Sequence, residues 1–205
     1  MANEKDIQKD ILKAATKVFI AKGKSGARMQ EIADEAGVNK MLLHYYFKNK
    51  ELLFEEVLKN TLTDLYYSVV EISYNANNFK DSLELFIEKH FEYLYKQRDI
   101  LGFLLWEVSH NGQNMQEIIT QMFQRLGNTP FDALTRKVND AIANGEIKEV
   151  QPSDFVLNLF SLDLFFFIAF PFIELFSNMK DSEMQILMEQ RKKEVFRILW
   201  NDIKL

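Results

Sequence analysis

A short segment between residues 39 and 50 carries side chains that suit contact with a double-stranded nucleic acid. In a helix that turns about 100° per residue, Met41 and Tyr45 fall opposite the apolar Val38, Leu43 and Phe47. Aromatic, amide and basic groups on such an outward face can contact base edges and phosphates. We therefore expect DNA binding through Asn39, Lys40, Met41, His44, Tyr45, Tyr46, Lys48 and Lys50.

A second, shorter helical pattern precedes this segment and positions it. Met29, Ile32, Ala33 and Ala36 recur at three- and four-residue spacing, which places them on one side of a helix. Gly37 then follows with no room for a loop, so it supplies a tight turn with left-handed backbone angles. Two helices joined in this way predict a helix-turn-helix in which the second helix reads the DNA.

The motif resembles the DNA-binding domain of the TetR family of bacterial transcriptional regulators. The resemblance rests on the run I32-A33-x-x-A36-G37-V38 and on the later run L43-H44-Y45-Y46-F47-K48-N49-K50-E51-x-L53. It covers roughly the first quarter of the chain. It implies an N-terminal three-helix DNA-binding domain over residues 1–50 and a C-terminal helical ligand-binding and dimerisation domain over residues 51–205.

Two positions depart from the family pattern. Ala27 and Arg28 stand where a pair of threonines is common, so the helix loses a hydroxyl cap unless Ser25 replaces it. Arg28 can still reach a phosphate, and we include it among the DNA-binding residues. Met41-Leu42 replaces a glycine and a small polar residue, so the operator of a relative cannot be carried over to this chain.

Composition predicts an all-α protein of about nine to ten helices. The chain has 205 residues, of which 47% are apolar, and it contains only seven glycines and three prolines, the residues that interrupt helices. Thr129 followed by Pro130 is a helix-start signal, and Gly145 fits the stop. The absence of cysteine excludes disulfides and thiolate metal sites. The N-terminus lacks an apolar signal segment, so we expect a cytoplasmic location.

Charge is distributed unevenly along the chain. Residues 1–50 hold ten Lys or Arg against six Asp or Glu, a net +4, whereas residues 51–205 carry −9. The positive part contains the reader helix, and an acidic remainder would orient that part toward DNA. Lys9, Lys13 and Lys17 follow one another at four-residue spacing, either as a solvated face or as supporting phosphate contacts.

The resemblance implies that the C-terminal part walls a cavity for a small apolar or aromatic effector. The candidate lining residues are Tyr66, Phe86, His90, Phe103, Trp106, Phe123 and Phe166, each of which could equally be plain core. His90 falls on the apolar side of its helix and could be a core residue with one hydrogen bond. No second histidine or carboxylate stands at metal spacing beside it, so we expect neither a metal nor a cofactor.

The run from Phe155 to Phe176 is apolar nearly all round. Asp163 interrupts it, which leaves no stretch of the roughly 20 residues that a bilayer requires, so we expect no membrane span. The better interpretation is a helix covered by its own core and by another subunit. The resemblance implies a homodimer formed by the last two helices. The expected interface residues are Phe155, Leu159, Leu162, Phe166, Leu187, Val195 and Ile198.

Three hypotheses follow from these observations. The first is a homodimeric repressor that binds a palindromic operator and releases it when an apolar effector binds the C-terminal domain. The second is a constitutive DNA-binding dimer whose C-terminal domain binds a protein partner or no ligand. The third is an enzyme, which the dispersed His44, His90 and His110 and the missing phosphate-binding loop argue against.

Overall fold

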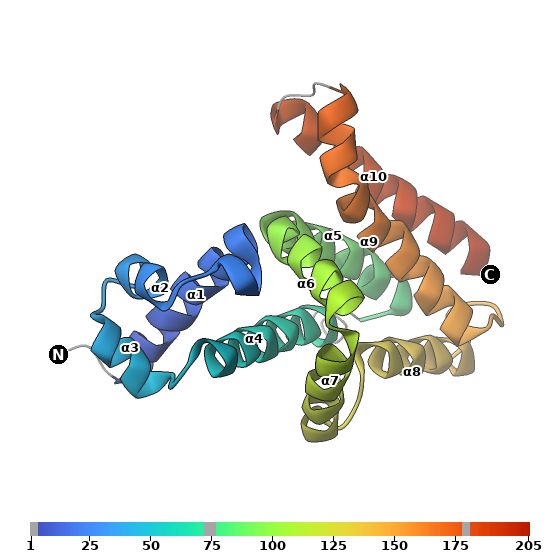
Figure 1. Cartoon of the computed structure of the whole chain (residues 1–205). Helices are drawn as coiled ribbons and strands as arrows, with labels where there is room; N and C mark the ends of the chain where they lie inside the picture. The colour runs from blue at the N-terminus through green and yellow to red at the C-terminus, as the bar shows by residue number, and fades with distance from the viewer. Residues whose placement is uncertain (1–3, 72–76, 178–180) are drawn as a thin grey trace. The chain divides into compact units, whose positions relative to one another are not determined.

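The computed structural model describes residues 4–71, 77–177 and 181–205, which fold into α-helices without a strand among them (Figure 1). The described helices are α1 (Glu4–Gly26), α2 (Met29–Glu35), α3 (Lys40–Tyr46), α4 (Lys50–Val70), α5 (Phe79–Lys96), α6 (Arg98–His110), α7 (Gly112–Leu126), α8 (Pro130–Ala143), α9 (Pro152–Ser177) and α10 (Asp181–Ile203). The predicted all-α class is confirmed, with ten helices in the described part of the chain.

The chain divides into two compact units. The first comprises Met1–Asp64 and Phe103–Met122, and the second comprises Leu65–Gly102 and Phe123–Leu205. Helices α4, α6 and α7 each contribute residues to both units. The functional division at residue 50, between DNA binding and the remaining functions, stays a prediction.

The first unit contains α1, α2 and α3, and α2 packs against both of the others. Ile11 and Phe19 of α1 are fully buried, and so is Ile32 of α2. The ring of Phe19 meets the ring of Phe54 on α4 edge to face, with centroids 4.9 Å apart. Helix α1 breaks at Gly23, where φ is 65°, a backbone angle that glycine adopts without steric cost.

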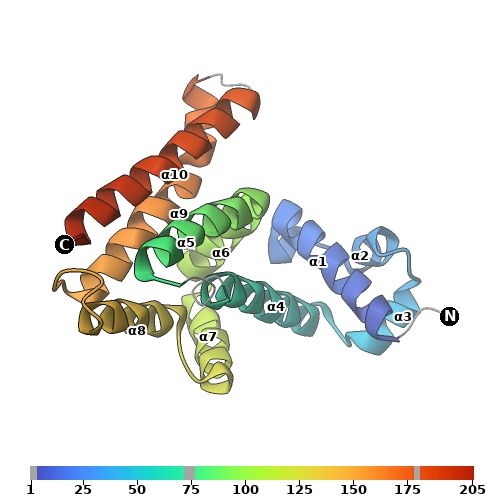
Figure 2. The same ribbon diagram turned by 180° about the vertical axis from the view of Figure 1, so that it is seen from behind.

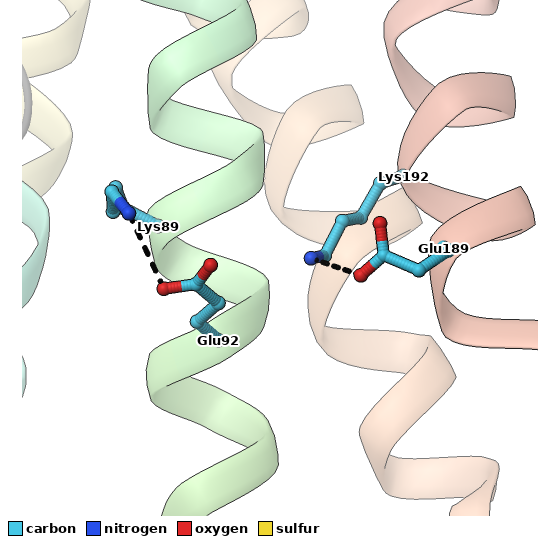
Figure 3. Close-up of polar contacts among 4 residues, drawn as sticks. All are labelled: Lys89, Glu92, Glu189 and Lys192. Atoms are coloured by element: carbon cyan, nitrogen blue, oxygen red, sulfur yellow. Dashed lines mark hydrogen bonds and ion pairs between the residues drawn. The ribbon is translucent and has the colours of Figure 1, made fainter. Parts of the chain in front are cut away.

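The second unit is built around α5, which packs against α8, α9 and α10 (Figure 2). Its core is rich in phenylalanine: Phe86 and Phe91 of α5 are buried, as are Phe166 and Phe167 of α9. Figure 3 shows two ion pairs in this unit, Lys89 with Glu92 on α5 and Lys192 with Glu189 on α10.

The predicted start of α8 is confirmed. Thr129 Oγ1 accepts a hydrogen bond from the Asp132 N–H, and the Asp132 carboxylate accepts one from the Thr129 N–H. Pro130 occupies the first turn, where a missing N–H costs nothing. This reciprocal capping box holds the pKa of Asp132 below its ordinary value, mainly through the Thr129 hydrogen bonds.

Helix α9 has one face in the protein core and one in solvent. Phe155, Leu159, Asp163 and Phe166 follow one another at about one helical turn, and all four are buried. The opposite face carries an apolar stripe, which we define as Leu157, Phe165, Ile168, Phe172, Leu175 and Phe176, with 40% to 81% of each residue exposed. By length and composition alone α9 could cross a membrane, a property that core helices of soluble proteins share; 33% of its most apolar window is buried.

The residues predicted for the dimer interface differ in their burial within the chain. Phe155, Leu159, Phe166 and Val195 are at most 7% exposed, so they contribute to the core of the chain itself. Leu162 and Leu187 are half-buried, and Ile198 is 38% exposed. The physical reason is that α9 is apolar nearly all round, so its pattern could not show which face the chain itself covers.

Candidate nucleic-acid interface

The turn between α2 and α3 is fixed by backbone hydrogen bonds. The Val38 N–H donates to the Ala33 carbonyl at 3.0 Å, and the Gly37 N–H donates to the Asp34 carbonyl at 3.2 Å. This pair of bonds is a Schellman motif, and it requires a left-handed residue after the helix end. Gly37 supplies that residue with φ at 67°, as predicted from its place in the sequence.

Helix α3 is held by its cap and by its inner face. The Leu42 N–H donates to the Asn39 Oδ1 at 2.8 Å, which satisfies one of the free donors at the helix start. Leu43 is fully buried and Phe47 is 5% exposed. These anchors fix the rotation of the helix about its axis and therefore decide which side chains point outward.

The outward side chains are those that the helical periodicity predicts. Met41 is 81% exposed and Tyr45 is 73% exposed, which is high for large apolar groups. Arg28, Asn39, Lys40, His44 and Lys48 are also exposed. Tyr46 is half-buried, and its ring meets that of Tyr45 edge to face at 5.2 Å.

Two of the predicted DNA-binding residues also have structural roles. Asn39 caps α3, as described above. Lys50 lies at the start of α4, and its Nζ donates to the Ala27 carbonyl at 3.2 Å and to the Ser25 carbonyl at 3.5 Å. The Lys50 ammonium therefore ties α4 to the segment between α1 and α2. A phosphate contact from Lys50 would have to share the ammonium with these carbonyls.

The start of α2 lacks a side-chain cap, as the replacement of threonine by Arg28 predicts. Arg28 occupies the cap position, where no side-chain hydrogen bond to the helix forms. Two ion pairs hold α2 against α1 instead, Lys22 to Glu31 at 3.1 Å and Lys17 to Glu35 at 2.6 Å. The Lys22 hydrogen bond lowers the pKa of the Glu31 carboxyl below its ordinary value. Lys9, Lys13 and Lys17 are all exposed, and Lys17 forms an ion pair within the unit.

The predicted effector residues are distributed over both units. Phe103 and Trp106 belong to the first; Phe103 is buried against the ring of Phe54, and Trp106 is 48% exposed and stacked on His110. The other five predicted residues belong to the second unit. In that unit Tyr66 contacts Phe123, Phe86 contacts His90, and Phe166 contacts Phe91.

The second unit holds a narrow apolar cavity of about 20 Å³ between α5, α8 and α9. We call it the seam cavity; its lining residues are Phe79, Ser82, Leu83, Phe86, Leu134, Lys137, Val138, Phe155, Val156 and Leu159. Phe86 is the one predicted effector residue that lines it. A drug-sized ligand requires roughly 300–1,000 Å³, so the seam cavity as it stands has room for about one water molecule.

Sequence reasoning missed the partner of His90. Its Nδ1 lies within hydrogen-bond distance of the Asp163 carboxylate, and both side chains are completely buried. The two residues are 73 positions apart, so no local spacing could pair them. The available signal was Asp163 itself, because a lone carboxylate in an apolar helix usually has a buried partner.

Comparison with known proteins gives a family match for the segment that contains this interface. Residues 11–57 match the family model described as bacterial regulatory proteins, tetR family. The transcriptional repressor SCO4008 of Streptomyces coelicolor is 35% identical over 97 residues, which are 47% of this chain and 47% of the repressor. The chain thus spans about half the length of the repressors that it matches first.

Longer alignments lead to regulators of the same kind. The fatty acid metabolism regulator protein of Bacillus subtilis is 27% identical over 139 residues, 68% of this chain and 70% of that protein. The solved structure of the regulator FadR of Bacillus subtilis in complex with stearoyl-CoA aligns with a TM-score of 0.68. That alignment has 20% identity and covers 93% of this chain and 96% of FadR, so it shows a shared fold.

Proposed function

We propose that this chain, a TetR-family DNA-binding transcriptional regulator, acts as a repressor that a small, mostly apolar effector releases from DNA. It would bind a palindromic operator as a homodimer and hold the effector in its C-terminal domain. The proposal places the protein in the cytoplasm with its DNA, and α9 within the protein rather than in a membrane.

The observation that carries the proposal is the outward face of α3. Met41 and Tyr45 stand exposed on a helix whose rotation is fixed by Leu43, Phe47 and the Asn39 cap. Apolar and aromatic groups in that position match thymine methyl groups and base edges in a major groove. The exposed Lys40 and Lys48 beside them can neutralise phosphates.

The dimer is supported by the apolar stripe of α9. A single seven-residue reader helix covers too little of the groove for useful specificity, and a two-fold dimer doubles the contact on a palindromic site. The apolar stripe leaves large side chains such as Phe172 in solvent, where a second copy could cover them. We therefore propose that the apolar stripe forms part of the dimer interface.

The effector hypothesis is supported by the similarity to FadR, whose structure contains stearoyl-CoA. An apolar effector fits a C-terminal domain whose core is rich in phenylalanine and aliphatic side chains. Binding would shift the population toward a dimer whose two α3 helices no longer fit both half-sites. A coupling of about 1–3 kcal/mol is typical for such a switch.

Replacing Tyr45 with alanine tests the proposed interface. We expect Tyr45→Ala to weaken binding to a selected duplex by roughly 5- to 150-fold, the equivalent of about 1–3 kcal/mol. The matched control is Tyr67→Ala, a half-exposed tyrosine on α4 outside the α3 face. Both variants should unfold at the wild-type temperature. Wild-type affinity of folded Tyr45→Ala in a gel-shift titration contradicts the assignment of this face.

One observation favours the second hypothesis, a constitutive DNA-binding dimer. The seam cavity of about 20 Å³ is too small for an effector unless the helices separate. Thermal unfolding with a panel of apolar and aromatic compounds distinguishes the two hypotheses. A repressor with an effector should gain several degrees with one class of compound and lose affinity for DNA. A constitutive dimer should show neither effect with any of them.

A further inference from the structure

Among the described residues of the second unit, His90 on α5 and Asp163 on α9 form a polar pair in the core, and both are fully buried. His90 Nδ1 and Asp163 Oδ2 bond to each other. The other two atoms, His90 Nε2 and Asp163 Oδ1, are buried with no hydrogen-bond partner among the described residues. Buried polar atoms without a partner are costly, so a native core that keeps two of them calls for a physical explanation.

The pair lies in a seam where α5 and α9 run side by side in matching register. Phe79 meets Phe155 at one end, with ring centroids 6.0 Å apart, and Tyr95 meets Phe170 at the other, at 6.2 Å. His90 and Asp163 occupy the seam between these two contacts. Each helical turn of α5 therefore faces the corresponding turn of α9.

The seam cavity occupies the turns immediately before the polar pair. Phe86 and Leu159 both line it. The ring of Phe86 lies 5.0 Å from the ring of His90, and Leu159 is one helical turn before Asp163. The cavity lining therefore reaches the residues one helical turn before His90 on α5 and one turn before Asp163 on α9.

The outer end of the seam cavity is polar. Lys137 Nζ donates to Ser82 Oγ at 3.2 Å, and both residues also line an open pocket of about 140 Å³. Burial lowers the pKa of Lys137, while Glu146 and Asp140 oppose that shift. The seam thus connects a solvent-facing polar mouth to a buried polar end through an apolar middle.

We propose that the seam opens between α5 and α9 to bind an elongated, mostly apolar molecule whose inner end donates a hydrogen bond to the His90–Asp163 pair. The donor is a hydroxyl or an amine. That this molecule is the effector rests on the function proposed above. Phe86 and Leu159 would move aside, because a cavity of about 20 Å³ has no room for a chain.

The hydrogen-bonding role of Asp163 Oδ1 selects a donor. His90 Nδ1 and Asp163 Oδ2 share one proton, and whichever of the two atoms holds it, Oδ1 is left as an acceptor. An ether offers no proton to Oδ1, whereas an alcohol or an amine does.

The seam also sets the length of the molecule. Ser82 at the mouth and His90 at the inner end are eight residues apart on one helix, which corresponds to about 12 Å. An extended decyl chain has this length. Decan-1-ol and decylamine are therefore suitable probes, and decyl methyl ether is the matched control without a donor.

Calorimetric titration of the full-length protein without DNA tests the proposal. We expect decan-1-ol, decylamine or both to bind wild type at least tenfold more tightly than the ether, and the better probe identifies the donor. In the double variant His90→Phe/Asp163→Leu, the three probes should bind equally. This variant should fold, because replacing both partners of a buried hydrogen bond by apolar groups of similar shape can be nearly neutral for stability. Equal binding of all three probes to wild type, or an unchanged preference in the double variant, overturns the proposal.

A second variant and a second assay keep the outcomes separate. Asp163→Asn preserves the shape of the side chain but removes the carboxylate, so this variant should bind the preferred probe at least tenfold more weakly than wild type. Wild-type affinity of the variant would contradict a hydrogen bond between the probe and the His90–Asp163 pair. Gel shifts with a selected duplex then test the effector role. If the wild-type protein prefers the donor probes but they leave its affinity for DNA unchanged, the binding site stands and its regulatory role is refuted. If the wild-type protein binds DNA but shows no preference for the donor probes, the binding site is refuted and the proposed DNA-binding function stands.

Discussion

Residues that look equivalent in the sequence of the DNA-binding segment have different roles in the structure. Lys48 is exposed and free to approach a phosphate, whereas Lys50 donates to two backbone carbonyls before α2. Both lysines were predicted to bind DNA, because the sequence does not show where a long side chain turns back onto its own unit. Met41 and Tyr45, at 81% and 73% exposed, contribute little to the core and are therefore the residues best suited to test DNA binding separately from stability.

Alanine at Lys50 and at Lys48 separates these roles. Lys50→Ala should lower the free energy of unfolding by about 0.5–1.5 kcal/mol, because it removes the hydrogen bonds to the Ala27 and Ser25 carbonyls. Lys48→Ala should leave stability within about 0.5 kcal/mol of wild type, since its side chain is exposed. Urea denaturation measures both. Equal unfolding midpoints for the two variants would contradict a stabilising role of the Lys50 hydrogen bonds to the Ala27 and Ser25 carbonyls.

At the scale of elements, the helix-turn-helix depends on one backbone angle. A methyl group at Gly37 would meet no atom within 4 Å, so sterics with neighbours do not explain the glycine. Its φ of 67° does, because a side chain resists left-handed angles. This feature could be predicted from the sequence, since a glycine between two short helical patterns has few other uses.

The same substitution at two glycines should therefore have opposite effects. Gly37→Ala should destabilise the protein by about 1–2 kcal/mol. Gly102→Ala, inside α6 with open space around it and no positive φ, should stabilise it by about 0.5–1 kcal/mol. Thermal unfolding of the two variants gives both signs. A stabilised Gly37→Ala would remove the stated reason for the turn.

The start of α8 gives a pH-dependent prediction. The pKa of Asp132 is lowered in the fold, so its contribution is present above the ordinary carboxyl pKa and lost as the pH falls through the lower folded value. Wild type should accordingly exceed Asp132→Asn in stability at pH 7. The difference should shrink as the pH is lowered past the ordinary pKa of aspartate. A difference that stays constant with pH indicates that the cap does not depend on charge.

At the scale of the molecule, α9 shows where sequence reasoning reached its limit. Its apolar composition predicted a helix covered on several sides, but the pattern could not separate the core face from the apolar stripe. The chosen interface residues were therefore largely core residues. The His90–Asp163 pair was missed for a related reason, because contacts across 73 positions arise from packing and not from spacing.

Substitution within the apolar stripe tests the proposed dimer. Phe172→Ser should raise the dimer dissociation constant at least tenfold, because it removes a large apolar side chain from the centre of the stripe. The matched control is Phe131→Ser on α8, where the phenylalanine is 37% exposed and outside the stripe. Sedimentation equilibrium measures both variants. Equal dissociation constants for wild type and Phe172→Ser would show that the apolar stripe is not the dimer interface.

Selection of bound duplexes from a random pool tests the central claim most directly, since it reports sequence preference and symmetry together. Wild type should enrich an inverted repeat whose half-site centres lie about one helical turn, or a multiple of it, apart. The folded double variant Met41→Ala/Tyr45→Ala should lose that enrichment. If wild type enriches no repeat, or if the double variant enriches the same one, the outward face of α3 is not what reads DNA.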